Sequence, residues 1–266
     1  MDTASIAKKF RTIGADAEVG RIRPNRWNRR RISVDVNNGV FDIRADKNVE
    51  VQVVDFDAKL RHLLLHVNDD GEKHKFLCGH DERDWFVAAV PGNGINGIDK
   101  AMEALKPQAA REAQSRAGVR RKNRHRRNND GFRRQGEWFF IPQPGFEPSK
   151  DAIVLKDEPI SRGRGSKPHN CEMMIRSGGE TVYVHPTFAG SGISQQEFDR
   201  RRMEAQANGD SRFRMGWRQM QRDAKVYVKG RISHSDHATI TLDCWHLVEM
   251  NTESNAPAMQ HVVFLD

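Results

Sequence analysis

Hydrophobic and polar residues alternate along much of the first half of the chain. VEVQVVDF (49–56) alternates apolar with polar side chains, which is typical of a half-buried strand. RHLLLHV (61–67) and KHKFLCGH (73–80) flank NDDG, a composition typical of a hairpin turn. DWFVAAVPG (84–92) is another apolar run, closed by Pro and Gly. These patterns predict neighbouring antiparallel strands.

Strand-like runs also dominate the second half, and helical patterns are few. A short helix is expected after Asn96, which is placed to cap it, and Pro107 would end it. A second helix is expected from Ser194, which forms a capping box with Glu197, to Asn208. The expected strands of this half are 136–142, 152–160, 181–186, 225–233, 238–248 and 261–266. The predicted fold class is α+β, predominantly antiparallel β, with a few short helices and basic arms or loops.

The positive charge is concentrated in two short tracts. RIRPNRWNRRR (21–31) has six Arg and no acidic residue, and 111–134 has ten Arg or Lys against two acidic residues. Because the whole chain carries +8, the remainder is mildly acidic. Such tracts are suited to an anionic partner, most commonly a phosphate polymer. Solvated, flexible tethers are the alternative interpretation.

Arginine outnumbers lysine in both tracts, and Trp27 lies in the first tract and His125 in the second. One guanidinium group can bind two phosphate oxygens at once and can stack on an unpaired base. This favours RNA or single-stranded DNA over plain duplex. Trp27 is equally well explained as a packing anchor. The residues predicted to contact nucleic acid are Trp27, Arg29, Arg30, Arg31, Arg120, Arg121, Lys122, Arg124, Arg126 and Arg127.

The charge pattern also divides the chain into four regions. We expect an N-terminal helix and basic arm (1–31), a first β-rich half (32–106), an arginine-rich flexible segment (107–134) and a second β-rich half (135–266). The two halves are also compatible with one continuous domain. Flexibility is expected for 107–134 because few residues there other than alanine are apolar.

Each of the three cysteines has a histidine two residues away, in LCGH, HNC and CWH. On a strand, residues two apart point to the same face and could offer two ligands to zinc or another divalent metal. The spacing is not that of common zinc knuckles, and a buried thiol beside a hydrogen-bonded histidine is the alternative. That alternative is favoured for Cys244 and His246, which share a strand face with apolar residues.

Two polar clusters are candidates for chemistry. HSDH places His234, Asp236 and His237 at the tip of an expected hairpin. HDERD places His80, Asp81 and Glu82 directly after a strand, where catalytic groups often lie. Ordinary turn composition and mutual ion pairing explain these clusters as well. The metal candidates are therefore Cys78, His80, His234 and His237, and the catalytic candidates are His80, Asp81 and Glu82.

Motifs of several large enzyme classes are missing from the sequence: no P-loop, GxSxG or HExxH pattern occurs. The leading hypothesis is a nucleic-acid-binding protein, possibly a subunit of a nucleoprotein assembly with further protein partners. A metal-dependent nuclease or other nucleic-acid-processing enzyme is one alternative, and a structural genome-packaging protein with arginine-rich arms is another.

Without an apolar run of membrane-spanning length or a secretory signal, a cytoplasmic protein with no membrane partner is expected.

Overall fold

The structure of the protein is a computed structural model that describes residues 2–22, 31–162, 166–210, 213 and 215–261. Helices account for 20% of it and strands for 47%, and the sheets are rich in antiparallel pairs. The predicted α+β class with predominant β-structure is therefore confirmed. The described residues form four sheets of three, four, seven and three strands.

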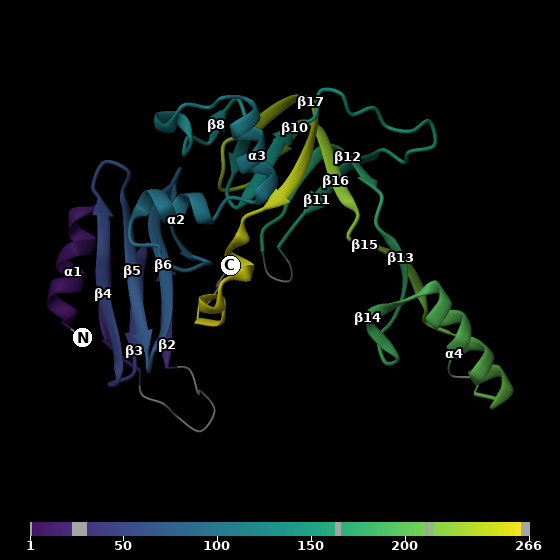
Figure 1. The fold of residues 1–266 in the computed structure, drawn as a ribbon, viewed down its shortest axis with the longest axis horizontal. Helices are drawn as coiled ribbons and strands as arrows, with labels where there is room; N and C mark the ends of the chain where they lie inside the picture. The colour runs from purple at the N-terminus through teal and green to yellow at the C-terminus, as the bar shows by residue number, and fades with distance from the viewer. Residues whose placement is uncertain (1, 23–30, 163–165, 211–212, 214, 262–266) are drawn as a thin grey trace.

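The first half of the chain builds two of these sheets and a helix around one core. Its elements are α1 (Thr3–Thr12), β1 (Asp16–Arg21), β2 (Ile32–Asn37), β3 (Val40–Ala45), β4 (Val49–Asp57), β5 (His62–Asp69), β6 (Glu72–Asp81) and β7 (Asp84–Ala89). The sheet β4–β5–β6–β7 is antiparallel throughout, and the sheet β1–β3–β2 pairs β1 with β3 in parallel. Helix α1 lies outside β4 (Figure 1) and buries Ile6 and Phe10 in the shared core.

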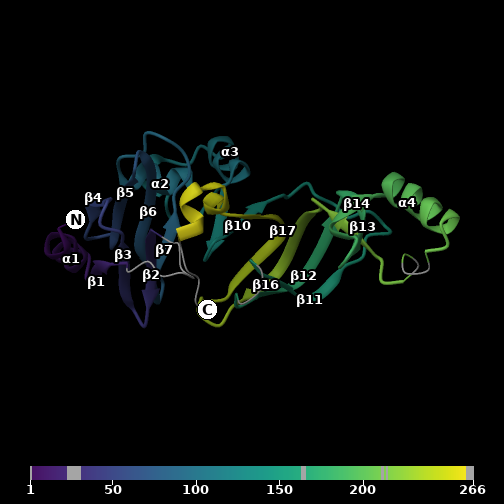
Figure 2. The same ribbon diagram turned by 90° about the horizontal axis from the view of Figure 1, so that it is seen from below.

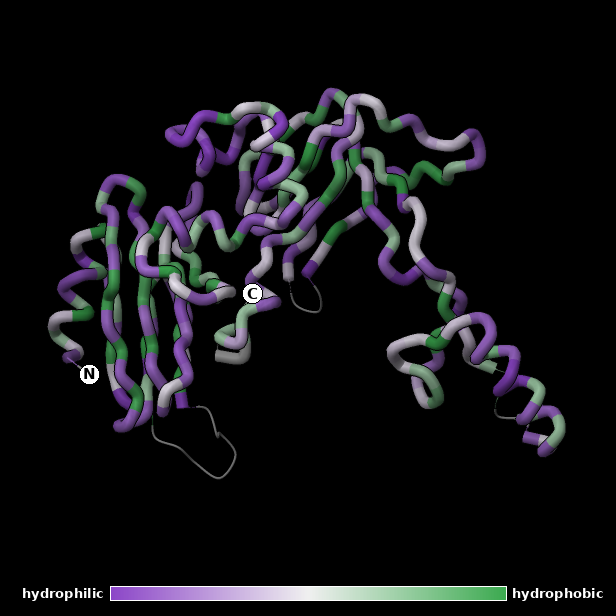
Figure 3. The backbone as a smooth tube through the Cα atoms, viewed as in Figure 1, coloured by the Kyte–Doolittle hydropathy of each residue, from purple (hydrophilic) through white to green (hydrophobic). Residues whose placement is uncertain are grey.

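The turn between β5 and β6 confirms the hairpin expected from NDDG. Asp70 and Gly71 have φ of 49° and 95°, in the left-handed region that these two residue types tolerate better than most. Asp69 therefore pairs directly with Glu72, and the two strands continue in register. Along the neighbouring strand β4 hydrophobic and hydrophilic residues alternate, as the sequence pattern predicted (Figure 3).

Helix α2 (Ile98–Ala104) is present, but it begins differently from our prediction. Its N-cap residue is Gly97, which makes no side-chain cap hydrogen bond. The Ile98 N–H donates instead to Asp55 Oδ2 of β4 at 2.9 Å. The prediction that Asn96 caps this helix is therefore wrong, because a carboxylate from the adjacent sheet takes the cap's place.

Helix α3 (Gln108–Arg116) occupies the start of the segment 107–134, where we expected flexibility. Its buried face consists of Ala110, Ala113 and Gln114 and packs against a cluster that includes Phe132 and Phe139. Small side chains allow this close approach, yet they contribute little to a hydrophobic pattern. The segment continues in the 3-10 helix η1 (Arg121–Asn123) and the short strands β8 (Asn128–Asn129) and β9 (Phe132–Gln135).

The second half of the chain centres on a seven-stranded sheet in the order β11–β12–β16–β17–β10–β9–β8. Four of its strands match the expected runs: β10 (Trp138–Pro142), β11 (Leu155–Ile160), β16 (Lys225–Ser233) and β17 (Ile240–Met250). A fifth, β12 (His169–Ser177), lies where no strand was expected. Phe140, Cys171 and Val228 belong to the core on this sheet, which is separate from the core of the first half.

A small three-stranded sheet and helix α4 (Gln195–Ala207) extend away from the seven-stranded sheet, with α4 at the far end of the molecule from α1 (Figures 1 and 2). The strands are β13 (Glu180–His185), β14 (Ala189–Ser194) and β15 (Arg218–Arg222). Ser194 Oγ accepts a hydrogen bond from the Glu197 N–H at 3.3 Å, which confirms the predicted start of this helix.

The C-terminal segment returns to the core of the first half. After β17 the chain forms the 3-10 helices η3 (Thr252–Asn255) and η4 (Pro257–His261). Ala256 and Ala258 are buried in the core that holds Phe10 and Phe41. The last residues of the expected second half thus pack with the first half. Residues 262–266, part of the last expected strand, lie outside the described residues.

Candidate functional site

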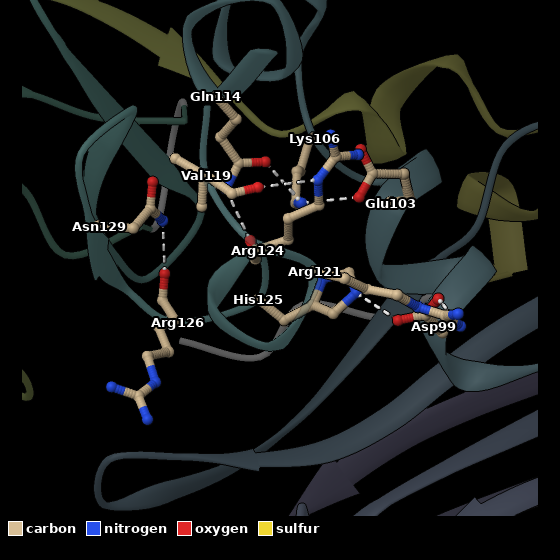
Figure 4. Close-up of polar contacts among 10 residues, drawn as sticks. All are labelled: Asp99, Glu103, Lys106, Gln114, Val119, Arg121, Arg124, His125, Arg126 and Asn129. Atoms are coloured by element: carbon tan, nitrogen blue, oxygen red, sulfur yellow. Dashed lines mark hydrogen bonds and ion pairs between the residues drawn. The ribbon is translucent and has the colours of Figure 1, made fainter. Parts of the chain in front are cut away.

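Residues 118–130, which we call the basic segment, lie against α3 on a frame of buried polar contacts. Lys106 is 3% exposed, and its ammonium donates to Glu103 at 2.7 Å and to Gln114 Oε1 at 2.9 Å. Gln114 Nε2 in turn donates to the Arg124 carbonyl at 2.8 Å. Burial lowers the pKa of Lys106, while Glu103 acts in the opposite direction. This chain of hydrogen bonds fixes the backbone of the basic segment to the helix (Figure 4).

Asp99 of α2 holds the basic segment from the other side. Its carboxylate lies 2.7 Å from His125 Nε2 and 3.4 Å from Arg121 Nη2 (Figure 4). The hydrogen bond from His125 is the main reason that the pKa of Asp99 is lowered. His125 is thus engaged with a carboxylate, and this contact limits its freedom to stack on a base.

Three cations of the basic segment are exposed together. Arg120, Lys122 and Arg126 line a concavity of about 400 Å³. Three asparagine side chains and one carboxylate share this lining, at Asn123, Asn128, Asn129 and Asp130. Within the described part of the chain, no ion pair holds these three cations. The arrangement presents guanidinium, ammonium and amide donors to one volume, which suits a ligand with several anionic oxygens.

The remaining predicted cations are occupied or lie outside the described residues. Arg124 Nε donates to the Val119 carbonyl at 3.5 Å, and Arg127 is ion-paired with Asp81 and Glu82. Arg31 lies 2.8 Å from Asp69 and 2.7 Å from Asp70. Trp27, Arg29 and Arg30 fall within 23–30, outside the described residues. The structure therefore separates the predicted contact residues into an exposed group and a group engaged within the protein.

The carboxylates proposed for catalysis make contacts across the molecule. Asp81 and Glu82 lie at the turn between β6 and β7, and Arg134 Nη2 is 3.2 Å from both Asp81 oxygens. Glu82 Oε2 accepts a hydrogen bond from the Ala238 N–H at 2.9 Å. These contacts join the sheet β4–β5–β6–β7 to β9 and to the loop between β16 and β17. A catalytic role for the two carboxylates and His80 stays a prediction.

Cys78 and His80 lie apart from the histidine pair with which we had grouped them. Cys78 is fully buried in the core of the first half, and burial raises the pKa of its thiol. His80 packs edge-on against Trp85, with ring centroids 4.9 Å apart. Among the described residues, neither belongs to a group of side chains close enough to hold one ion.

His234 and His237 come together with a third histidine, His169. His169 begins β12, and the other two lie in the loop between β16 and β17. The ring centroids are 4.1 Å apart for His169 and His234, 4.7 Å for His234 and His237, and 5.6 Å for His169 and His237. One ligand atom from each histidine lies within 4.8 Å of those of the other two. We call these three residues the histidine cluster.

Burial keeps the histidine cluster uncharged near neutral pH. His169 is 2% exposed, and its desolvation, with the neighbouring histidines, lowers its pKa to about 3. Desolvation also lowers the pKa values of His234 and His237. Three neutral imidazoles are therefore available as lone-pair donors. Sequence spacing paired His169 with Cys171 instead, because the strand register that brings His169 beside His234 cannot be read from local sequence.

A second group of potential ligands consists of Asp243, Cys244 and His246 of β17. His246 is 1% exposed, and its Nδ1 donates to the Cys244 carbonyl at 2.8 Å. The same nitrogen lies 3.8 Å from Cys244 Sγ. Since Nδ1 is already used by the backbone, the geometry fits the expected hydrogen-bonded core histidine better than a ligand.

Comparisons with known proteins add no relative to this picture. No protein-family model, curated protein or solved structure matches the chain. Among the helices of the described residues, none has the length and apolar character needed to cross a membrane.

Proposed function

We propose that the protein binds nucleic acid through the exposed cations of the basic segment. The observation that carries the proposal is the shared concavity of Arg120, Lys122 and Arg126 on a backbone fixed by buried hydrogen bonds. Phosphate contacts from Arg and Lys release condensed counterions, which makes such binding favourable and dependent on salt. A fixed backbone reduces the entropy lost on binding.

The ligand we propose is RNA or single-stranded DNA, contacted mainly at its phosphates. Arginine side chains can bind phosphate oxygens and stack on unpaired bases, and asparagine amides at Asn123 and Asn128 can donate to phosphate or sugar oxygens. Binding is favoured over the nuclease alternative by the state of the carboxylates. Asp81 and Glu82 are held by Arg127, and these ion pairs give them a structural use.

Fluorescence anisotropy with labelled single-stranded RNA, single-stranded DNA and duplex DNA tests this proposal. The variant to compare with the natural protein replaces Arg120, Lys122 and Arg126 with Gln. We expect weaker binding to all three probes, and a slope of log affinity against log salt that is shallower by about 2 for single strands.

A matched control removes three exposed cations elsewhere, with Lys47, Lys59 and Lys150 replaced by Gln. It changes the net charge equally and should leave most of the salt slope intact. Equal losses in both triple variants would show that net charge alone attracts the probe. Unchanged affinity and slope in the first triple variant would overturn the proposal.

A further inference from the structure

We propose that His169, His234 and His237 together bind one zinc ion. This inference goes beyond nucleic-acid binding and does not depend on it. The ligand atoms come from the start of β12 and from the loop that follows β16, which strand pairing holds side by side, with Asn170 opposite Ser233. They lie within 4.8 Å of one another, so small side-chain rotations bring them to the separation that a tetrahedral ion requires.

His169 provides the first supporting observation. It is 2% exposed, and neither of its ring nitrogens has a hydrogen-bond partner among the described residues. Buried polar atoms are nearly always paired, because leaving them without a partner costs free energy. A metal ion in contact with one nitrogen would provide the missing interaction.

Gly136 provides the second observation, since it leaves space in front of two of the rings. A Cβ atom at this position would lie 2.9 Å from His237 Nε2 and 3.6 Å from His169 Nε2. The residue also has φ of 57°, which disfavours most side chains. The backbone thus keeps open a volume beside these two nitrogens that a side chain would fill.

The other nitrogens of the two loop histidines have contacts that would orient the rings. His237 Nδ1 lies 3.4 Å from Glu82 Oε2, and a carboxylate behind a ligating histidine is a common supporting contact. His234 Nε2 lies 3.3 Å from the Lys167 carbonyl and must be the donor, because a carbonyl only accepts. His234 Nδ1 accepts from the Asp236 N–H at 3.1 Å, and the ion would replace this hydrogen bond.

Zinc is the ion that this set of ligands suits. Imidazole nitrogen is one of the ligands that zinc prefers in proteins. Three histidines with an open fourth position are typical of zinc sites that bind water or substrate. His237 and Gly136 also line a pocket of about 200 Å³, and Asp81 and Glu137 belong to the same lining. Water or a small ligand would reach the fourth position from this pocket.

Titration calorimetry with zinc chloride on the untagged, chelator-treated full-length protein tests the proposal. One ion should bind per chain, and cobalt(II) in its place should give the intense visible absorption of four-coordinate cobalt bound to nitrogen. His169→Ala and His237→Gln should each weaken zinc binding by about 100-fold or more. His246→Ala and His80→Ala, which alter histidines outside the cluster, should bind zinc as the natural protein does.

The two ligand variants protect the test against a folding defect. His169 is buried, whereas His237 lies in a loop with 16% of its side chain exposed, and far-UV circular dichroism identifies any variant that fails to fold. Zinc should raise the melting temperature of the natural protein and leave that of folded His237→Gln unchanged. An absence of zinc binding, or binding that His237→Gln leaves intact, would overturn the proposal. Loss caused equally by His246→Ala would also do so.

Discussion

Arg127 Nη1 lies 2.5 Å from Glu82 Oε1, so a cation of the basic segment is bound to the turn that joins β6 and β7. The other oxygen of the same carboxylate accepts the Ala238 N–H at 2.9 Å. Glu82 thus joins three parts of the chain that are remote in sequence: the sheet β4–β5–β6–β7, the basic segment and the loop that carries His234 and His237. Its φ of 44° is uncommon for a side chain of this size, and the two contacts help to hold the turn in that conformation.

The contacts of Glu82 predict a loss of stability when its carboxylate is removed. Glu82→Ala leaves Arg127 with one carboxylate fewer and the Ala238 N–H without its acceptor. We expect the free energy of unfolding to fall by about 1 to 3 kcal/mol in urea denaturation. Glu50→Ala, at an exposed position of β4, is the control and should change stability by less than about 0.5 kcal/mol. Equal effects of the two substitutions would contradict the role given to Glu82.

Helix α3 packs closely on the turn between β8 and β9, so we expect a side chain at Gly131 to destabilise the protein. A Cβ at this position would lie 2.7 Å from both the Gln114 backbone nitrogen and its Cγ, so α3 would have to shift. Gly131→Ala should therefore lower the free energy of unfolding by about 1 to 3 kcal/mol. It should also speed trypsin cleavage after Arg116, because the helix is loosened.

Gly145→Ala is the matched control for Gly131→Ala. A Cβ at position 145 meets nothing within 4 Å. This substitution should therefore change the free energy of unfolding by less than about 0.5 kcal/mol and leave the cleavage pattern unchanged. Rapid cleavage after Arg116 in the natural protein would show that α3 opens readily, as the sequence pattern alone suggested.

The sequence predicted those elements whose stability depends on local pattern. Strand β4 alternates clearly, β5 and β6 each contain a continuous buried run, and Ser194 with Glu197 marks the start of α4. Helix α3 was missed because its buried side chains are two alanines and Gln114, none of which stands out in a hydrophobic pattern. The cap of α2 was missed because Asp55 is 43 residues from Ile98 along the chain.

The candidate site shows the same limit. Local composition identified His234 and His237 as a pair, since both lie in one loop. His169 could not be added from sequence, because only the pairing of β12 with β16 brings it beside His234. Within the basic segment, composition showed the density of charge but not which cations are engaged. Arg127 is held by carboxylates whose position depends on how the two halves pack.

The burial of His62 predicts how the free energy of unfolding depends on pH below neutrality. The residue is 9% exposed, its Nδ1 donates to the Leu60 carbonyl at 2.5 Å, and its ring packs edge-on against Phe86. Burial lowers its pKa in the folded protein, whereas in the unfolded chain the pKa is about 6.5. Below pH 6.5 the unfolded chain therefore binds more protons than the folded protein, so stability falls as the pH falls toward the lowered pKa.

Urea denaturation of the natural protein and His62→Gln at pH 7.5, 6.5 and 5.5 measures this contribution. Between pH 6.5 and 5.5 the natural protein should lose up to about 1 kcal/mol more than the variant, because the unfolded chain takes up more of a proton at this histidine than the folded protein does. The other histidines are common to both proteins, so their titration cancels in the difference. Since Gln carries no titrating proton, parallel pH profiles would mean that His62 is protonated in the folded protein and that its pKa is not lowered.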